Sequence, residues 1–247
     1  MQVYKIGGNE LGDPEFLAAL AGAVAAVADG PIAIVHGGGK AIADLQAKLG
    51  LQTVKVDGLR VTDTESLAAA QMVLSGQANK QIVAALLAAG VDAVGLSGVD
   101  GGLLRCQKKQ HPTADLGFVG EVVEVRAELV EMLMERGITA VISPISLGLD
   151  GQIYNVNADE AASAEALALN ADMLHFISNV PGVIYKDDVL AELTASQTED
   201  LIANSVIRDG MVPKVRAALE AIGRGVPQAR IGNLDGLIQG IGTVFTK

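Results

Sequence analysis

The chain has 247 residues, of which 50% are hydrophobic, 19% are charged and 3% are aromatic. This composition excludes a disordered chain, and a core built mainly from Ala, Val, Leu and Ile suits parallel strands covered by helices. The formal net charge of -11 argues against general binding of nucleic acid, because such a surface repels phosphate backbones, although a locally positive site can still accept small anions.

Cys106 is the single cysteine, which rules out an internal disulfide bond and a cysteine-based zinc site. One unpaired thiol fits a reducing compartment. The first residues, MQVYKIGG, lack the apolar segment of a signal peptide, and no apolar run reaches membrane-spanning length. We therefore expect a cytoplasmic protein.

Strand-like and helix-like segments alternate from the first residues onward. The apolar patterns predict, in chain order, a strand at 2–6, a helix at 14–29 capped by Asp13, a strand at 32–36, a helix at 40–50, a helix at 78–89 and a strand at 93–96. Between the second and third helices, Asp57-Gly58 predicts a hairpin turn. Thr62 and Glu65 have the spacing of a capping box for a helix from about Asp63.

The second half continues this alternation after an interruption at 97–126, where two short arms indicate an antiparallel excursion. The patterns then predict helices at 127–137, 158–169 and 214–223, strands at 139–145, 173–178 and 229–233, and an edge strand at the C-terminus. Such alternation indicates an α/β fold with a mostly parallel open sheet and helices on both faces. We expect two lobes, 1–170 and 171–247.

Two glycine-rich stretches directly follow predicted strands, namely Gly7-Gly8 and Gly37-Gly38-Gly39. Backbone amides of such loops, beside a helix N-terminus, can cradle an anion. The alternative is a pair of plain tight turns, which we find less convincing for three glycines in a row. The stretch HGGGK lacks the glycine and hydroxyl positions of a P-loop and the third glycine of a dinucleotide fingerprint.

Several charged and polar residues suggest a functional site rather than an ordinary solvent-exposed surface. Lys5 lies within the first predicted strand, where a core lysine is unusual unless it faces water from an edge strand. Asn155, Asn157 and Asp159 alternate in NVNAD, so they would share one side of an extended chain, although Asp159 could simply serve in the first turn of a helix.

Arg60, after the predicted hairpin turn, is either an exposed ion-pair partner or a bidentate clamp for a carboxylate. Lys214 opens a predicted helix, where a cation needs a compensating anion. The histidines His36, His111 and His175 share no metal-ligand spacing, and we interpret His36 as a structural hydrogen-bonding residue. Lys40, beside the glycines, is expected to face solvent.

These pieces together resemble the amino acid kinase family. The matching segments occur in family order over nearly the whole chain and read KIGG (5–8), VHGGGK (35–40), GLRVTD (58–63), GQANK (76–80), VGLSGVDGG (94–102), NVNADEAA (155–162), SNVPGV (178–183) and DGMVPK (209–214). The resemblance implies the amino acid kinase, carbamate-kinase-like fold. It is strongest to members that use ATP to phosphorylate the side-chain carboxylate of N-acetyl-L-glutamate, the second step of arginine biosynthesis.

The resemblance also implies roles for individual residues. Lys5 and Lys214 would be catalytic and contact the phosphates, and Asp159 would hold both lysines. The N-acetylated amino acid would be bound by Gly38, Gly39, Arg60, Asn155 and Asn157. The nucleotide would be bound by Lys5, Gly7, Gly8, Asn179, Met211 and Lys214. Lobe 1–170 would carry the amino-acid site and the dimer contacts, and lobe 171–247 the nucleotide.

The expected cofactor is ATP with Mg²⁺ carried mainly by its phosphates, and we predict no protein metal site. The resemblance to members without an additional N-terminal helix implies a homodimer. Two alternatives stay open at this point. One is a kinase of the same fold that acts on aminoadipate or glutamate attached to a carrier protein, against which the charge of -11 argues. The other is a non-catalytic nucleotide-binding sensor.

Overall fold

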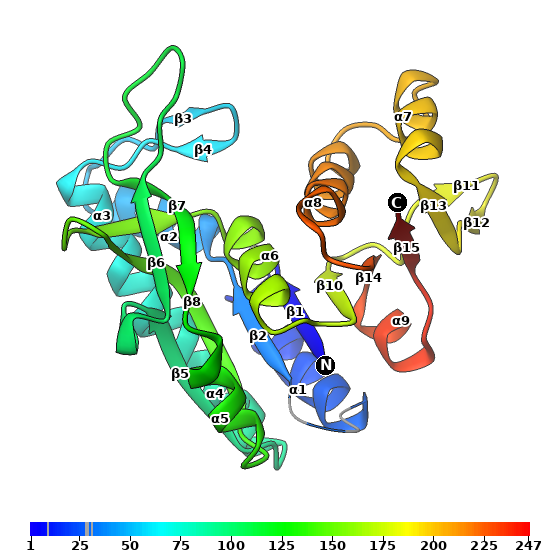
Figure 1. Ribbon diagram of the computed structural model, residues 1–247, viewed down its shortest axis with the longest axis horizontal. Coiled ribbons are helices and arrows are strands. Elements are labelled where there is room, and N and C mark those ends of the chain that lie inside the picture. Colours follow the sequence, from blue (N-terminus) through cyan, green and yellow to red (C-terminus); the bar gives the residue numbers. More distant parts are fainter. Residues whose placement is uncertain (9, 28–29, 31) are drawn as a thin grey trace.

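The computed structural model of the protein describes residues 1–8, 10–27, 30 and 32–247. Strands and helices alternate along most of these residues (Figure 1). The strands are β1 (Gln2–Ile6), β2 (Ala33–His36), β3 (Lys55–Val56), β4 (Leu59–Arg60), β5 (Ala93–Gly98), β6 (Leu104–Lys108), β7 (Val119–Val125), β8 (Thr139–Gly148), β9 (Ile153–Val156), β10 (Met173–Ile177), β11 (Ile184–Tyr185), β12 (Asp188–Val189), β13 (Glu192–Thr194), β14 (Ala229–Gly232) and β15 (Thr243–Thr246).

The α-helices are α1 (Pro14–Val27), α2 (Gly39–Lys48), α3 (Thr64–Gln71), α4 (Asn79–Ala88), α5 (Ala127–Met134), α6 (Ala158–Ala168), α7 (Ala195–Ala203), α8 (Met211–Arg224) and α9 (Leu234–Gln239). A π-helical segment, Met72–Ala78, joins α3 to α4, and a short 3-10 turn occupies Asp100–Gly102.

One sheet organises the molecule. Among the described residues it has 11 strands in the order β13-β15-β14-β10-β1-β2-β8-β6-β7-β9, with β5 paired to β8. Most neighbours are parallel, including β1 with both β2 and β10, whereas β6 and β7 are antiparallel. The mostly parallel open sheet predicted from the alternating pattern is therefore confirmed, and so is the antiparallel excursion at 97–126.

Helices cover both faces of this sheet (Figure 1). Successive residues of β1 point to opposite faces, so Val3 joins an apolar cluster with α5, α6 and α8, while Tyr4 joins one with α1, α4 and α9. Both residues are at most 1% exposed. The fold is the three-layer α/β arrangement that the Ala- and Val-rich composition favours.

Local signals placed several elements correctly. The first strand spans the predicted residues, Gln2–Ile6. Asp57 and Gly58 both have positive φ, 48° and 82°, as the turn between β3 and β4 requires. The carboxylate of Asp13 accepts a hydrogen bond from the amide of Glu15 at the start of α1. The predicted end of that helix, residues 28–29, lies outside the described residues.

The capping box predicted from Thr62 is wrong by one position. The N-cap of α3 is Asp63, whose side chain accepts from the amide of Ser66 at 2.7 Å. Thr62 is unavailable for that role because its backbone pairs with a loop from far along the chain, donating to Leu116 and accepting from Phe118.

Two further expectations near the C-terminus are corrected. The last strand, β15, is not an edge strand, because it lies between β13 and β14. Lys214 does not open its helix, because α8 begins at Met211 and holds Pro213 in its first turn. Proline fits there since the first amides of a helix have no partner within the helix.

Candidate active site

Two glycine loops lie side by side at the carboxyl ends of β1 and β2, where Ile6 is opposite His36. The amide of Gly37 donates to the carbonyl oxygen of Ile6 at 3.0 Å, which extends the strand ladder into the loops. A Cβ atom on Gly8 would come within 2.2 Å of the nitrogen of Gly38. The loops touch backbone to backbone, so no residue with a side chain fits at position 8.

The other predicted anion-binding glycines differ in their surroundings. A Cβ atom on Gly38 would lie 2.6 Å from Cδ2 of Leu74 in the π-helical segment, so a larger residue there would force the leucine side chain to move. A Cβ atom on Gly39 would have no atom of the described residues within 4 Å. Gly39 begins α2, whose N-terminus no side chain caps. Open amides at a helix N-terminus favour an anion. Gly7 is half-buried just after β1.

Lys5 lies in the interior of the sheet. Its neighbours across the ladders are Val35 on β2 and Phe176 on β10, which excludes the interpretation of Lys5 as a water-facing residue of an edge strand. Its Nζ lies 2.8 Å from Oδ1 of Asp159, and 17% of the Lys5 side chain is exposed. The structure thus brings together two of the three residues predicted to be catalytic.

Asp159 owes its position to the start of α6. The side chain of Asn157 caps this helix by accepting from the amide of Asp159 at 2.7 Å, and Ser163 Oγ donates to the carbonyl oxygen of Asp159. The prediction that Asn155, Asn157 and Asp159 share one extended segment is wrong, because the helix begins at Ala158. Both interpretations of Asp159 hold in part, since it belongs to a first helical turn and also pairs with Lys5.

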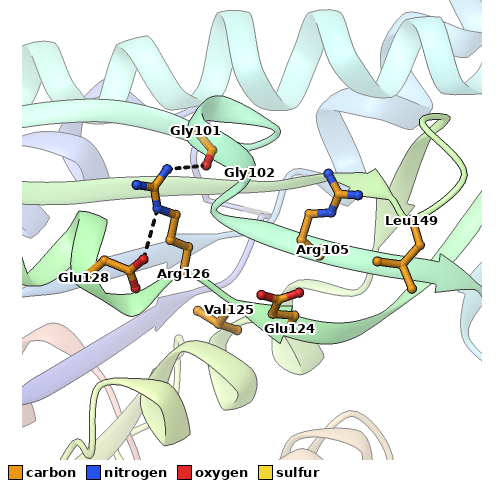
Figure 2. A pocket seen from close by; sticks show the side chains of 8 residues that line it. All are labelled: Gly101, Gly102, Arg105, Glu124, Val125, Arg126, Glu128 and Leu149. Carbon is orange, nitrogen blue, oxygen red and sulfur yellow. Dashed lines mark hydrogen bonds and ion pairs between the residues drawn. The ribbon is translucent and has the colours of Figure 1, made fainter.

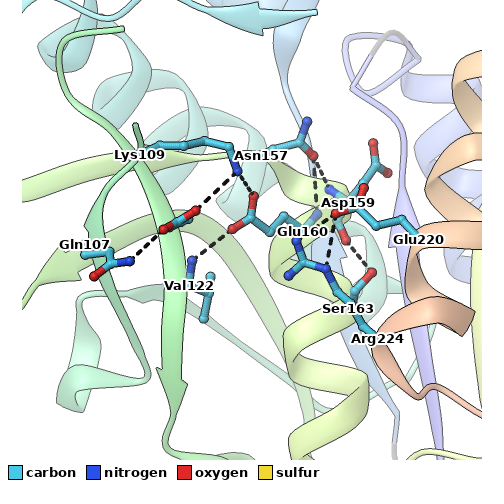
Figure 3. A network of polar contacts seen from close by, with 10 residues as sticks. Gln107, Lys109, Val122, Asn157, Asp159, Glu160, Ser163, Glu220 and Arg224 are labelled. Carbon is cyan, nitrogen blue, oxygen red and sulfur yellow. Dashed lines mark hydrogen bonds and ion pairs between the residues drawn. The ribbon is translucent and has the colours of Figure 1, made fainter. Parts of the chain in front are cut away.

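A second network anchors the same turn of α6 (Figure 3). Glu160, 8% exposed, accepts from Nζ of Lys109 at 2.7 Å and from the amide of Val122 at 3.0 Å. Gln107 and Glu121 extend the network along the β6–β7 hairpin. Sequence reasoning missed these residues, because the partners of Glu160 lie 38 and 51 positions away and form no local pattern.

Lys214 approaches the site from α8. Its Nζ donates to Oδ1 of Asn179 at 3.4 Å, and Met211 lies half-buried at the start of the same helix. Asp159 was expected to hold both lysines. The structure instead pairs Asp159 with Lys5 and Lys214 with Asn179. Three of the six residues predicted to bind the nucleotide, Asn179, Met211 and Lys214, therefore lie on α8 and on the loop that follows β10.

Arg60 is 9% exposed and is tied to the glycine loops. One guanidinium nitrogen donates to the carbonyl oxygen of Gly39 at 2.8 Å. The other donates to Oε1 of Gln46 and, at 3.3 Å, to Oγ1 of Thr53. Burial lowers the pKa of Arg60 from its ordinary value. The arginine is therefore a fixed, partly desolvated cation and not an exposed ion-pair partner.

Asn155 is joined to Arg60 through Thr62. The amide nitrogen of the Asn155 side chain donates to Oγ1 of Thr62 at 3.4 Å, and this hydroxyl donates to the carbonyl oxygen of Arg60 at 2.8 Å. Gly39, Arg60 and Asn155, three of the residues predicted to bind one ligand, thus belong to one connected group. Asn157 uses its side-chain oxygen as a helix cap.

A concave surface lies elsewhere, with a cavity volume of about 480 Å³ (Figure 2). Its walls come from the 3-10 turn before β6, the start of β6, the end of β7, the start of α5 and the loop after β8. Two arginines and two glutamates line it, together with glycine and apolar residues: Gly101, Gly102, Arg105, Glu124, Val125, Arg126, Glu128 and Leu149. It shares no residue with the predicted site around the glycine loops.

Two features are absent from the residues that the structure describes. No group of three or more His, Cys, Asp and Glu side chains in that part of the chain is placed to hold a metal ion. No helix there combines the length and apolar character needed to cross a membrane.

Comparison with known proteins matches nearly the whole chain to one family. Residues 1–233 match the model of the Amino acid kinase family. The acetylglutamate kinase of Roseiflexus sp. (strain RS-1) is 52% identical over 245 residues, which are 99% of this chain and 93% of that protein.

Two solved structures have a similar architecture. The crystal structure of smu.665 from Streptococcus mutans UA159 has a TM-score of 0.81 and 30% identity, and the match covers 99% of this chain and 98% of that one. The structure of Giardia carbamate kinase has a TM-score of 0.72 and 16% identity and covers 100% of this chain and 98% of that one. The second likeness concerns the fold alone, and it confirms the predicted carbamate-kinase-like architecture.

Proposed function

The chain belongs to the amino acid kinase family, and we propose that it is an acetylglutamate kinase. It transfers the γ-phosphoryl group of ATP to the side-chain carboxylate of N-acetyl-L-glutamate and so performs the second step of arginine biosynthesis. The observation that carries the proposal is the 52% identity to an acetylglutamate kinase over 99% of the chain. The ion pair of Lys5 with Asp159 beside two glycine loops supports it.

The reacting carboxylate needs no general base. A glutamate side chain has an ordinary pKa of about 4.3 and is ionised at neutral pH. The difficulty of the reaction lies in bringing this anion to the anionic γ-phosphate. Positioning and charge stabilisation therefore supply most of the catalysis.

We assign the charge stabilisation to two lysines. Lys5 and Lys214 contact the phosphates and stabilise the moving phosphoryl group, and Asp159 orients Lys5. Support for Lys5 comes from its interior position and its 2.8 Å contact with Asp159. Support for Lys214 comes from its contact with Asn179, at the nucleotide side of the proposed site.

The glycine loops and the Arg60 group bind the two substrates in this proposal. Amides of Gly7 and Gly8 face the phosphates, and those of Gly38 and Gly39 face the attacking carboxylate. Arg60, Asn155 and Asn157 hold the acylated amino acid, and Asn179 and Met211 line the adenine side. The contact between Arg60 and the carbonyl of Gly39 supports this arrangement, because it links the amino-acid group to the loop.

Several wider expectations belong to the same proposal. Residues 1–170 form the lobe for the amino acid and the dimer contacts, and residues 171–247 form the nucleotide lobe. The enzyme is a cytoplasmic homodimer. Mg²⁺ enters on the phosphates of ATP, as is usual for this ion, and neutralises part of their charge.

An assay that traps acyl phosphate tests the function. Purified protein is incubated with Mg-ATP, N-acetyl-L-glutamate and hydroxylamine, and the hydroxamate formed from the acyl phosphate is measured. We expect turnover of free N-acetyl-L-glutamate and none of N-acetyl-L-glutamine, which keeps the α-carboxylate but has an amide in place of the side-chain carboxylate. Activity only on carrier-bound aminoadipate or glutamate would point to the carrier-linked kinase, and no phosphorylation of any acyl amino acid would point to a nucleotide-binding sensor.

A further inference from the structure

His36 is completely buried at the end of β2, immediately before the three glycines. Its ring makes two contacts. Nδ1 lies 2.9 Å from the carbonyl oxygen of Gly37, and Nε2 lies 3.3 Å from the side-chain nitrogen of Asn79. The sequence indicated only a structural histidine, and these contacts allow a more specific role.

The contact with Gly37 determines which ring nitrogen carries the proton. A carbonyl oxygen can only accept, so Nδ1 of His36 must donate to Gly37. Burial lowers the pKa of His36 from 6.5 to about 4, so the ring is neutral at physiological pH. In a neutral ring with a proton on Nδ1, Nε2 has a lone pair and must accept.

Asn79 is oriented to match this tautomer. Its side-chain nitrogen also faces the carbonyl oxygens of Val141 at 2.9 Å and Leu96 at 3.2 Å, while its oxygen accepts from Nζ of Lys80 at 2.8 Å. The amide nitrogen is therefore the atom that faces His36, and its two hydrogens are shared among Nε2 and the two carbonyl oxygens. Both ring contacts are therefore those of a neutral imidazole that carries its proton on Nδ1.

The ring in turn holds the peptide that joins Gly37 to Gly38. In a trans peptide the N–H of Gly38 points opposite to the carbonyl of Gly37. The carbonyl faces the imidazole, so the N–H of Gly38 is directed away from it, and the backbone of Gly8 lies close to that nitrogen. Glycines permit many backbone conformations, so this peptide needs an external contact to keep one orientation.

We propose that His36, through its Nδ1–H, is a positioning residue that aims the amide of Gly38 at the reacting groups. Asn79 keeps the ring in the tautomer that can do so. The inference rests on the proposed function, in which the amide of Gly38 serves the attacking carboxylate. It deepens that function by assigning the buried histidine a task that involves no proton transfer.

The tautomer can be measured without any activity assay. Nitrogen-15 NMR of the imidazole in the wild-type protein should show a neutral ring protonated at Nδ1, with no titration between about pH 5.5 and pH 8. A ring protonated at Nε2, or one that gains a proton in this range, would overturn the proposal. Because this readout needs no substrate, it also separates failure of the inference from failure of the proposed function.

Two substitutions separate the two nitrogens. His36→Asn keeps an N–H donor near the position of Nδ1, whereas His36→Gln keeps a polar group only near the position of Nε2. We expect His36→Asn to retain kcat within about threefold, and His36→Gln to lower kcat by about tenfold or more, a fraction of what loss of a whole oxyanion donor costs. KM for ATP should change little in both.

His175 provides the matched control, since it is also a buried strand histidine, 3% exposed, on β10. His175→Asn and His175→Gln should leave kcat of the folded protein unchanged. Equal loss of kcat in both His36 variants, or full activity of His36→Gln, would refute the proposal. If His36→Gln does not fold, the tautomer measured by NMR and the activity of His36→Asn still test the proposal.

Discussion

The ammonium group of Lys5 lies 2.8 Å from a carboxylate oxygen of Asp159, so the first strand and the first turn of α6 meet in an ion pair beside the glycine loops. Lys5 lies on an interior strand of the sheet, where a positive charge is unusual. The ion pair holds this charge at the carboxyl ends of parallel strands, which is where ligands of such sheets bind.

Lys5→Ala should lower kcat by about 100-fold or more, because the charge stabilises the phosphoryl group most while it moves. Steady-state kinetics in the trapping assay measures this. Lys40→Ala is the control. Lys40 is 63% exposed and pairs with Asp44 on the surface of α2, so its removal should leave kcat unchanged. An unaltered kcat in Lys5→Ala would remove Lys5 from the mechanism.

Asp159→Asn should impair kcat without unfolding the protein, because the amide cannot hold the charge of Lys5 but can still occupy the first turn of α6. Thermal unfolding and kinetics are measured together. For comparison, Asn157→Ala removes the helix cap and should cost about 1 kcal/mol of stability. If Asp159→Asn instead lowers the thermal stability and leaves kcat unchanged, Asp159 acts only in the helix.

Arg60→Lys should raise KM for N-acetyl-L-glutamate by about tenfold or more, which is about 1.4 kcal/mol. The two guanidinium nitrogens serve different partners, Gly39 and Gln46, and one ammonium group cannot replace both. Arg136→Lys, at an exposed helix end, is the control and should have no effect. A change confined to KM for ATP would mean that Arg60 has been assigned to the wrong substrate.

Glu165→Gln should stabilise the protein at pH 8. Glu165 is 0% exposed on α6, and neither of its carboxyl oxygens has a hydrogen-bond partner among the described residues. Burial raises its pKa from 4.5 to about 8. The folded state therefore binds a proton that the unfolded state releases, and stability falls as pH rises from about 4.5 to 8.

Chemical unfolding at several pH values checks this. Glu165→Gln should exceed the wild type by a few kcal/mol at pH 8 and match it near pH 4.5. Glu135→Gln, on an exposed helix end, should show no such difference. A wild-type protein whose stability is flat between these pH values would contradict the buried, protonated carboxyl.

The alternating elements could be predicted because they depend on neighbours in the chain. The strand at Gln2–Ile6 and the turn at Asp57-Gly58 follow from apolar spacing and backbone preference, which act over a few residues. The same locality explains the errors. Thr62 has the right spacing for a helix cap, but its backbone forms hydrogen bonds with Leu116 and Phe118. A local sequence pattern cannot predict contacts with residues so far along the chain.

Part of the candidate site could likewise be predicted from the local sequence, and part could not. Lys5, the glycines and NVNAD stand out from the chain because a core lysine, three consecutive glycines and three polar residues at alternate positions are each locally unusual. Their grouping into one site came from resemblance to a family, since spacing alone says nothing about contacts between distant segments. For this reason the sequence could not predict the contact of Lys109 with Glu160.

Local chemistry therefore accounts for which elements form and which residues are out of place in them. The order of strands, the meeting of Lys5 with Asp159 and the proton arrangement of His36 were decided by the tertiary structure. The physical reason is that pairing of distant strands and burial of charged groups depend on the packing of the whole chain. The same packing places Gly8 against Gly38, so the glycines make room for each other as well as for a ligand.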